Sequence, residues 1–371
     1  MRLKQIMKKV LITMSGGVDS SVAAALLKER GYAVTGVTMK IWAGKVAAEA
    51  PLHHGCYGPE EEEDIEDARR VAKQLDIPFH VLDLTSEYRF EVLDYFSREY
   101  LSGRTPNPCV RCNPIIKFGA LIEKARRSGL QFDAIASGHY AKVMYDAQQK
   151  RYILKKAKDL TKDQSYCLSF LSQKQLGQLI LPLGGYPKTE IRAIAQRFGL
   201  HIAAKPDSQN FVCGDYTSLI KTKSTTGPIL DKSGNLLGQH KGIQFYTIGQ
   251  RKGLGISAPD PLYVTMLDPI NNAVIVGTKA ELFRDEFIVT DLNWISIATL
   301  DQPLEMNMKI RSSQKDSAAI VTPLNNDEVL VKLKQAQPAV TPGQTAVFYQ
   351  DEVVTGGGII EEVRTNTENH H

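Results

Sequence analysis

A strand, a glycine turn and a helix start follow one another early in the chain. Residues 10–14 form an apolar run typical of a buried strand, Ser15-Gly16-Gly17 predicts a tight turn, and residues 18–28 carry apolar side chains at helical spacing. Two glycines let the backbone approach an anion closely, and the N–H groups at the start of a helix point toward it. The hydroxyls of Ser15, Ser20 and Ser21 add hydrogen-bond donors. These residues predict a phosphate site.

The sequence of the turn indicates which class of phosphate-binding loop it belongs to. A Walker loop would end in Gly-Lys-Ser/Thr, which does not occur in this sequence. The turn Ser-Gly-Gly-Val-Asp-Ser instead resembles the PP-loop of ATP pyrophosphatases, which cleave ATP to AMP and pyrophosphate and adenylate a substrate oxygen. The resemblance implies Mg²⁺ held mainly by the phosphates near Asp19, and ATP contacts from Thr13, Met14, Ser15, Gly16, Gly17, Val18, Asp19 and Ser20.

A pair of cysteines, Cys109 and Cys112, lies in the proline-rich segment 105–113. Because proline neither continues a helix nor donates a backbone hydrogen bond, we expect a loop that presents two thiols. Arg111 and a following helix start would lower a thiol pKa, as a nucleophile requires. Three alternatives stay open: half of a zinc site, for which no second Cys-x-x-Cys exists; a redox pair; or two buried, inert cysteines.

Three more cysteines complete the set. Cys213 lies beside Gly214-Asp215, where a loop at a domain boundary suits a mobile reactive group; the alternative is packing in a hinge. Cys167 is expected in the core. Cys56 follows two histidines, and an incidental loop is a simpler interpretation than a metal site.

The size and composition of the chain limit the compartments and partners that it can have. The chain has 371 residues, of which 43% are hydrophobic and 23% charged, with a net charge of +4. No apolar stretch approaches the roughly 20 residues of a membrane span, and we expect no membrane partner. Five cysteines, an odd number in a large chain, favour a reducing compartment over a disulfide scaffold. With no secretory segment at the N-terminus, a cytoplasmic location is expected. A mildly basic chain permits a nucleic-acid partner without requiring one.

The chain divides by the rhythm of its predicted elements. Strand and helix signals alternate over the first half, with strands over 33–42, 79–84 and 132–136 and helices over 60–75 and 116–127. This α/β alternation predicts a parallel sheet, whose carboxyl edge would bring together the 13–20 loop, Met39 and Ser137-Gly138-His139. A helical stretch over 160–200 follows, in which Thr189 would cap a helix. The character changes beyond about residue 210, and from Gly242 onward short β-rich runs and turn signals such as Asp268–Asn272 predict antiparallel barrels.

Several motifs, in order from about residue 8 to 362, resemble the tRNA-specific 2-thiouridylase family. They are the 13–20 loop, Met39, 103–108 with Cys112-Asn113 and Lys117-Phe118, 138–140, 162–166, 247–255 and 341–344. The resemblance implies a PP-loop catalytic domain over 1–210, a central β-rich domain over 211–278 and a C-terminal β-barrel over 279–364, the last two binding tRNA.

It also implies an activity: ATP adenylates the C2 oxygen of uridine 34 in tRNA for Lys, Glu and Gln, and a cysteine persulfide delivers sulfur. A cysteine desulfurase or an upstream persulfide carrier would load that cysteine. By motif, Cys112 is the catalytic nucleophile, Met39 and Gly138 contact ATP, and Asn107, Pro108 and Cys109 face the base. The implied tRNA contacts are His139, Lys162, Asp163, Gln164, Arg311, Ser312 and Gln344.

Two departures from the family pattern concern the thiols. Cys109 stands where many members carry Asp, and the family's persulfide position falls on Val212, one residue before Cys213. In one scheme Cys213 carries the persulfide and Cys112 resolves it. In the other, which we favour less, Cys109, Cys112 and Cys213 hold an iron–sulfur cluster with one open iron. Outside thiolation, the alternatives are a PP-loop synthetase with a nitrogen nucleophile and a tRNA-binding module with a vestigial nucleotide fold.

Overall fold

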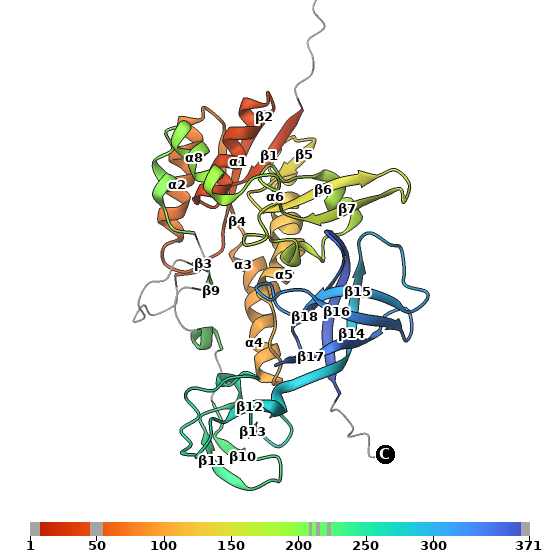
Figure 1. Cartoon of the computed structure of the whole chain (residues 1–371). Helices are drawn as coiled ribbons and strands as arrows, with labels where there is room; N and C mark the ends of the chain where they lie inside the picture. Colours follow the sequence, from red (N-terminus) through yellow and green to blue (C-terminus); the bar gives the residue numbers. More distant parts are fainter. Residues whose placement is uncertain (1–7, 45–54, 208–209, 213–215, 221–223, 365–371) are drawn as a thin grey trace, which may run out of the picture. The chain divides into compact units, whose positions relative to one another are not determined.

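The computed structural model describes residues 8–44, 55–207, 210–212, 216–220 and 224–364. By its internal contacts the chain forms two compact units (Figure 1). Unit 1 comprises Met1–Val92, Cys109–Tyr216 and Glu352–Val354, and unit 2 comprises Leu93–Pro108, Thr217–Asp351 and Thr355–His371. In the described ranges, no helix combines the length and apolar character needed to cross a bilayer. The bounds of the three predicted domains stay predictions.

Unit 1 is built on a five-stranded sheet in the order β4-β2-β1-β5-β8, with every pairing parallel. The strands are β1 (Lys9–Thr13), β2 (Ala33–Lys40), β4 (Phe79–Asp83), β5 (Ala134–Ala136) and β8 (Leu179–Ile180). Val10 and Ile12 pack into a core with helices on one face. Leu11, equally buried, points to the other face, as the alternation of a strand requires. The predicted parallel α/β sheet is confirmed.

The helices of that core are α1 (Val18–Glu29), α2 (Glu61–Gln74) and α8 (Lys188–Arg197), which Figure 1 shows together beside the strands. Alanines 23–25 let α1 approach the sheet closely, and all three are buried. The predicted helix over 160–200 is wrong in part. That stretch contains a short 3-10 turn (Tyr166–Leu168), α7 (Gln173–Gln178), β8 and α8. Because α8 already begins at Lys188, Thr189 lies inside the helix and does not cap it.

Between β4 and β5 the chain is helical. It runs through α3 (Thr85–Tyr88), a π-helix (Arg89–Leu93), α4 (Asp94–Leu101), α5 (Pro108–Cys112), a second π-helix η2 (Asn113–Ala120) and α6 (Leu121–Arg127). Our prediction of a loop around the two cysteines is therefore wrong. Pro108 occupies the first position of α5, where a missing N–H costs nothing, so proline here starts the helix.

Two smaller pairings also belong to unit 1. Strands β6 (Ala141–Asp146) and β7 (Arg151–Lys156) form an antiparallel hairpin. Strand β3 (Gly55–Tyr57) pairs in parallel with β9 (Asn210–Val212), so the segment that leads to Cys213 in sequence is joined to the segment that holds Cys56. Cys213 itself lies outside the described residues.

Unit 2 holds two β-structures. A four-stranded sheet has the order β11-β10-β13-β12, from Leu236–His240, Gly227–Leu230, Ala273–Gly277 and Tyr263–Asp268. In the predicted turn after β12, the Asp268 carboxylate accepts from the N–H groups of Ile270 and Asn271. Strands β14 to β19 form a closed antiparallel barrel, because β14 pairs with β19 as well as with β17. Their bounds are Phe283–Trp294, Leu304–Lys309, Ser317–Pro323, Val329–Pro338, Thr345–Gln350 and Val353–Val363.

Candidate functional site

The loop after β1 is shaped by its glycines and by its own hydroxyls. Gly16 has φ +75°, and a Cβ there would lie 2.2 Å from the Asp64 carbonyl oxygen, so only glycine fits. The Ser20 hydroxyl donates to the Gly17 carbonyl oxygen at 3.2 Å and accepts from the Ser15 N–H at 3.1 Å. Ser21 is fully buried and donates to the same carbonyl at 2.8 Å. The expectation that Ser21 offers a free donor is therefore wrong: its hydroxyl holds the turn.

One cavity of about 250 Å³ opens at the carboxyl ends of β1, β2 and β5. Its lining includes Thr13, Met14, Ser15, Gly17, Val18, Asp19 and Ser20 together with Met39, Gly138, His139 and Gln164. These segments lie far apart in the sequence and meet here because parallel strands end at one edge of the sheet. The topology thus brings together the residues expected at a nucleotide.

Gly138 is packed directly against the start of α1. A Cβ at this position would lie 2.6 Å from the Ser20 nitrogen and 2.8 Å from the Asp19 carbonyl carbon. Both neighbours are backbone atoms and cannot swing aside. Glycine at 138 is therefore required for the β5 end to approach the phosphate loop.

Asp19, in the first turn of α1, has two strong partners. The Lys188 ammonium lies 2.7 and 2.8 Å from its two carboxylate oxygens, and the Tyr140 hydroxyl donates to it at 2.7 Å. Burial and the negative charge of Asp19 raise the pKa of Tyr140, so its phenol keeps the proton that it donates. Sequence reasoning missed Lys188, which is only 9% exposed, and no local motif signals it.

Lys188 also reaches Asp207, 2.7 Å away. Asp207 receives two further cations, Lys162 at 2.8 Å and Arg192 at 3.1 Å. Burial alone would raise the pKa of Asp207, but hydrogen bonds from Lys162 and Lys188 outweigh it and hold the pKa below its ordinary value. Lys162, expected at tRNA, is therefore engaged inside unit 1.

Two acids of α2 also face the cavity. The Glu61 carboxylate accepts from the N–H groups of Ile41 at 2.7 Å and Trp42 at 3.1 Å, which fixes the chain after β2. Burial raises the pKa of Glu61 despite these hydrogen bonds. Asp64 pairs with Lys205 at 2.7 Å.

The four described cysteines form no disulfide with one another. Cys109 and Cys112 lie on α5, Cys56 lines the cavity, and Cys167 is partly buried. Burial raises the pKa of Cys112 to about 11 and that of Cys109 well above its usual range. The expectation that Arg111 lowers a thiol pKa is wrong, because Arg111 is paired with the Glu91 carboxylate at 2.9 Å.

Three more residues expected at tRNA have partners within unit 1. His139 Nδ1 lies 2.8 Å from the Ser137 hydroxyl, and burial, with a smaller contribution from the charge of Lys117, holds the pKa of His139 well below its usual range. Asp163 accepts from the Ala157 N–H at 2.9 Å and the Ser165 hydroxyl at 2.7 Å. The Gln164 side-chain oxygen accepts from the Tyr140 N–H at 2.9 Å. Asp163 and Gln164 thus hold the loop that borders the cavity.

In unit 2, two of the family-like motifs contact each other. The Thr105 N–H donates to the Pro342 carbonyl at 2.9 Å, and a Cβ on Gly343 would lie 2.9 Å from the Thr105 nitrogen. Arg104 pairs with Glu99 at 2.7 Å and Glu361 at 2.9 Å. These motifs therefore have a packing role.

The remaining predicted tRNA residues of unit 2 border these segments. Asn107 and Pro108 are partly exposed, and Gln344 follows Gly343. Ser312 is exposed in a turn after β15, and the Arg311 guanidinium donates to the Ala339 carbonyl at 3.4 Å. Their roles toward tRNA stay predictions.

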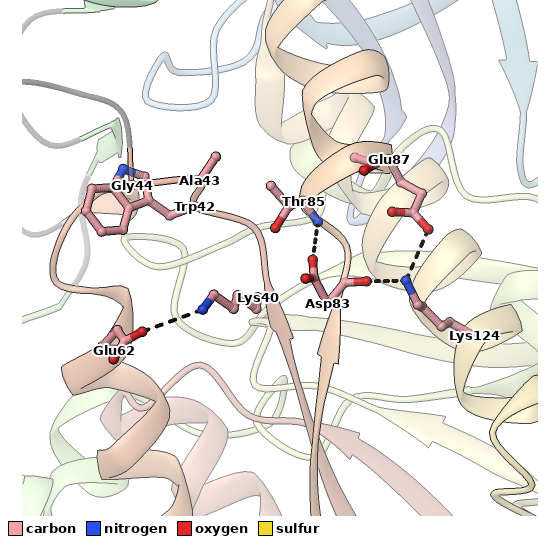
Figure 2. Close-up of a pocket in the computed structure, with 10 residues that line it drawn as sticks. Lys40, Trp42, Ala43, Gly44, Glu62, Asp83, Thr85, Glu87 and Lys124 are labelled. Carbon is pink, nitrogen blue, oxygen red and sulfur yellow. Dashed lines mark hydrogen bonds and ion pairs between the residues drawn. The ribbon is translucent and has the colours of Figure 1, made fainter.

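A second, more open cavity lies at the carboxyl ends of β2 and β4 (Figure 2). Lys40 points toward Glu62, 3.6 Å away, and Lys124 lies 3.4 Å from Glu87. The charged side chains of this cavity thus pair with one another. We assign it no ligand.

The residues of the cavity fit some of the expected ligands better than others. The glycine cradle and the N-terminus of α1 suit a phosphate chain, and Asp19 is placed to meet a Mg²⁺ that the phosphates carry. Among the described residues, no group of three or more His, Cys, Asp or Glu side chains could hold a metal ion. A three-cysteine cluster would require Cys213, outside those residues.

A parallel sheet with this loop at its carboxyl edge, followed by two β-structures, defines a PP-loop α/β protein with appended barrels. Residues 8–213 match the family model of the tRNA methyl transferase HUP domain, residues 218–278 that of the tRNA methyl transferase PRC-barrel domain, and residues 284–360 that of the aminomethyltransferase beta-barrel domain.

Proteins described as tRNA-specific 2-thiouridylase MnmA are similar over nearly the whole chain. The one from Endomicrobium trichonymphae is 46% identical over 95% of this chain and 98% of its own length. The one from Clostridioides difficile is 47% identical over 96% of this chain and 98% of its own length. The chain belongs to the tRNA-specific 2-thiouridylase family.

Proposed function

We propose that this chain is an ATP-dependent tRNA-uridine 2-sulfurtransferase that converts the wobble uridine 34 of tRNA for Lys, Glu and Gln to 2-thiouridine. The observation that carries the proposal is the single cavity in which the Asp19 loop, Met39 and Gly138 meet, in a chain 46–47% identical to named 2-thiouridylases. ATP would bind with its phosphates at the N-terminus of α1.

The first half of the reaction makes a leaving group. The uridine C2 oxygen attacks the α-phosphorus of ATP as N3 loses its proton, and pyrophosphate leaves. The C2 oxygen can then leave as part of AMP. AMP is the better leaving group because it is far less basic than an oxide ion. Mg²⁺, when bound, would neutralise charge on the phosphates. Asp19, held in place by Lys188 and Tyr140, would orient that phosphate end of the cavity.

The second half transfers sulfur. The outer sulfur of a persulfide on Cys213 attacks C2, and the C2–O bond breaks as AMP leaves. The Cys112 thiolate then attacks the Cys213 sulfur, so that the S–S bond breaks, the outer sulfur stays on C2 and a Cys112–Cys213 disulfide forms. N3 regains a proton as the thione forms, and a dithiol reductant restores both thiols. An upstream persulfide carrier or cysteine desulfurase would reload Cys213.

The tRNA would be held by both units. Uridine 34 must leave its stack to reach C2, so Asn107, Pro108 and Cys109 are proposed to face the flipped base. Arg311, Ser312 and Gln344 are proposed to contact the tRNA from the C-terminal barrel, with His139, Lys162, Asp163 and Gln164 beside the cavity. Contacts of this kind to phosphates and sugars would position the tRNA without reading its sequence.

The test measures each half-reaction on purified protein. Asp19→Ala should abolish pyrophosphate release from ATP and tRNA, because it removes the carboxylate at the mouth of α1, while tRNA binding persists. Mass spectrometry of the tRNA nucleosides should detect 2-thiouridine with wild-type enzyme and none with the variant. Near-normal pyrophosphate release from Asp19→Ala would refute the ATP site. About four irons per anaerobically purified chain, with Cys109→Ser as inactive as Cys112→Ser, would replace the persulfide scheme by the cluster scheme.

A further inference from the structure

The charges that line the nucleotide cavity do not match an anionic ligand. Four carboxyl groups and one lysine face it: Asp19, Glu61, Asp64, Asp207 and Lys117. A nucleoside triphosphate brings several further negative charges. Unless the carboxylates are balanced from behind, the cavity would repel its own substrate.

Each of these acids is in fact balanced by its own partners, and the two lysines among those partners, Lys188 and Lys205, do not line the cavity. Lys188 serves both Asp19 and Asp207, and Lys205 serves Asp64. Glu61 accepts two backbone N–H groups, and burial raises its pKa toward the neutral form. The cations that neutralise the acids are thereby committed to them and are not available to a ligand.

Lys117 stands apart from this arrangement. It lines the cavity from the π-helix η2 and is half-buried. Among the described residues, no hydrogen bond or ion pair occupies its ammonium group. Partial burial of an unpaired ammonium group costs free energy. In addition, π-helical turns are frequent at functional sites. The contacts among the described residues therefore give no structural reason for the position of Lys117.

The same lysine is close to the thiols. Cys112 immediately precedes η2 and lies five residues before Lys117. Because a π-helix bonds residue i to i+5, the two side chains emerge on similar sides of it. The positive charge of Lys117 lowers the pKa values of Cys112, Cys109 and Cys167 against the larger effect of burial. Among the described residues, Lys117 is the one cation with this effect on all three thiols.

We propose that Lys117 is a catalytic residue whose ammonium group contacts the phosphates of the bound nucleotide and also stabilises the thiolate of Cys112. The inference rests on the proposed function, since it takes the ligand of the cavity to be ATP. One cation between nucleotide and thiol would act on the phosphates in the first half-reaction and, in the second, on the Cys112 thiolate that attacks the Cys213 sulfur. Charge would be stabilised in both half-reactions without a further residue.

The experiment compares Lys117→Gln and Lys117→Arg with Lys174→Gln, which makes the same charge change at an exposed position on α7 that does not line the cavity. Calorimetry measures the Kd for a non-hydrolysable ATP analogue with Mg²⁺ and, separately, for adenosine. Lys117→Gln should weaken binding of the analogue at least tenfold and of adenosine less than twofold. Lys117→Arg should restore most of the affinity, and Lys174→Gln should behave as wild type.

A second readout follows the thiol. The rate at which iodoacetamide alkylates Cys112, measured by peptide mass spectrometry at pH 8, should fall several-fold in Lys117→Gln and stay unchanged in Lys174→Gln. Removal of an unpaired ammonium should leave the Tm unchanged or higher, whereas loss of a structural ion pair would lower it.

The outcomes distinguish a failure of the proposed function from a failure of the role proposed for Lys117. Wild-type protein that binds no ATP analogue would refute the proposed function itself. Wild-type binding that Lys117→Gln retains within twofold would refute the phosphate contact alone. An unchanged alkylation rate at Cys112 would refute the contact with the thiolate, and equal losses for analogue and adenosine would indicate collapse of the cavity.

Discussion

Replacing Gly138 by alanine tests whether the close approach of β5 to the phosphate loop sets the geometry of adenylation. The new Cβ would lie 2.6 Å from the Ser20 nitrogen, whereas ordinary van der Waals contact begins at 3.4 Å, so the two segments must separate by 0.8 Å (3.4 − 2.6). Overpacking of this kind costs about 1–3 kcal/mol. For a domain of this size, that lowers the Tm by roughly 2–12 °C.

The effect on catalysis should exceed the effect on stability. A reacting group misplaced by ~1 Å loses on the order of 100-fold in rate. We therefore expect Gly138→Ala to reduce kcat/KM for ATP-dependent pyrophosphate release by about two orders of magnitude, while the protein remains folded by circular dichroism.

The matched control is Gly185→Ala. Gly185 is exposed, and a Cβ there meets nothing within 4 Å. This variant should retain both the Tm and the kinetics of the wild type. A Gly138→Ala enzyme with wild-type KM for ATP and wild-type kcat would refute the reasoning, because the phosphate loop would then tolerate displacement.

Two further predictions concern titratable groups. Because burial raises the pKa of Cys112 to about 11, its alkylation by iodoacetamide should rise about tenfold per pH unit from pH 7 to 10, followed by mass spectrometry; a plateau below pH 9 would contradict this. Lys205→Met should lower the free energy of urea unfolding by about 3 kcal/mol, since it leaves the 6%-exposed Asp67 side chain with one cation fewer. Burial would raise the pKa of Asp67, but hydrogen bonds from Lys205 and His201 outweigh it, so the stabilisation is present above pH ~4, the unfolded pKa, and is lost as the pH falls through the lower folded pKa. The pH dependence of unfolding should be shallower in the variant, and equal slopes would contradict the assignment.

The sheet and its carboxyl edge could be predicted from the sequence because their signals are local. Apolar runs bounded by turns predicted β1, β2 and β4 to within about two residues, and strand alternation with helices required a parallel order. Once that order is known, the meeting of Met39 and Gly138 with the phosphate loop follows from topology alone. This prediction required no knowledge of contacts between distant side chains.

Pairings between distant side chains could not be predicted in this way. Arg111 stands beside two cysteines in sequence, which suggested an activating charge, but its guanidinium is occupied by Glu91 twenty residues earlier. Lys188 shows no motif, and its importance comes from reaching Asp19 and Asp207 at once. The rule that proline breaks a helix fails at Pro108, which begins one. Each of these predictions failed for the same reason. A rule about neighbours in sequence was applied where a distant partner, or the residue's position within a helix, decides the outcome.

The protonated state of the thiols is itself a constraint on the chemistry. With a pKa near 11, roughly one Cys112 in ten thousand carries a thiolate at pH 7, so the resting thiol neither oxidises nor attacks readily. A sulfur-transfer enzyme benefits from that inertness, because a disulfide formed before the base is adenylated would waste the sulfur. The same burial means that the reaction must lower the thiol pKa when substrate is present. A cation that faces both thiol and nucleotide meets this requirement, and an arginine already paired to Glu91 does not.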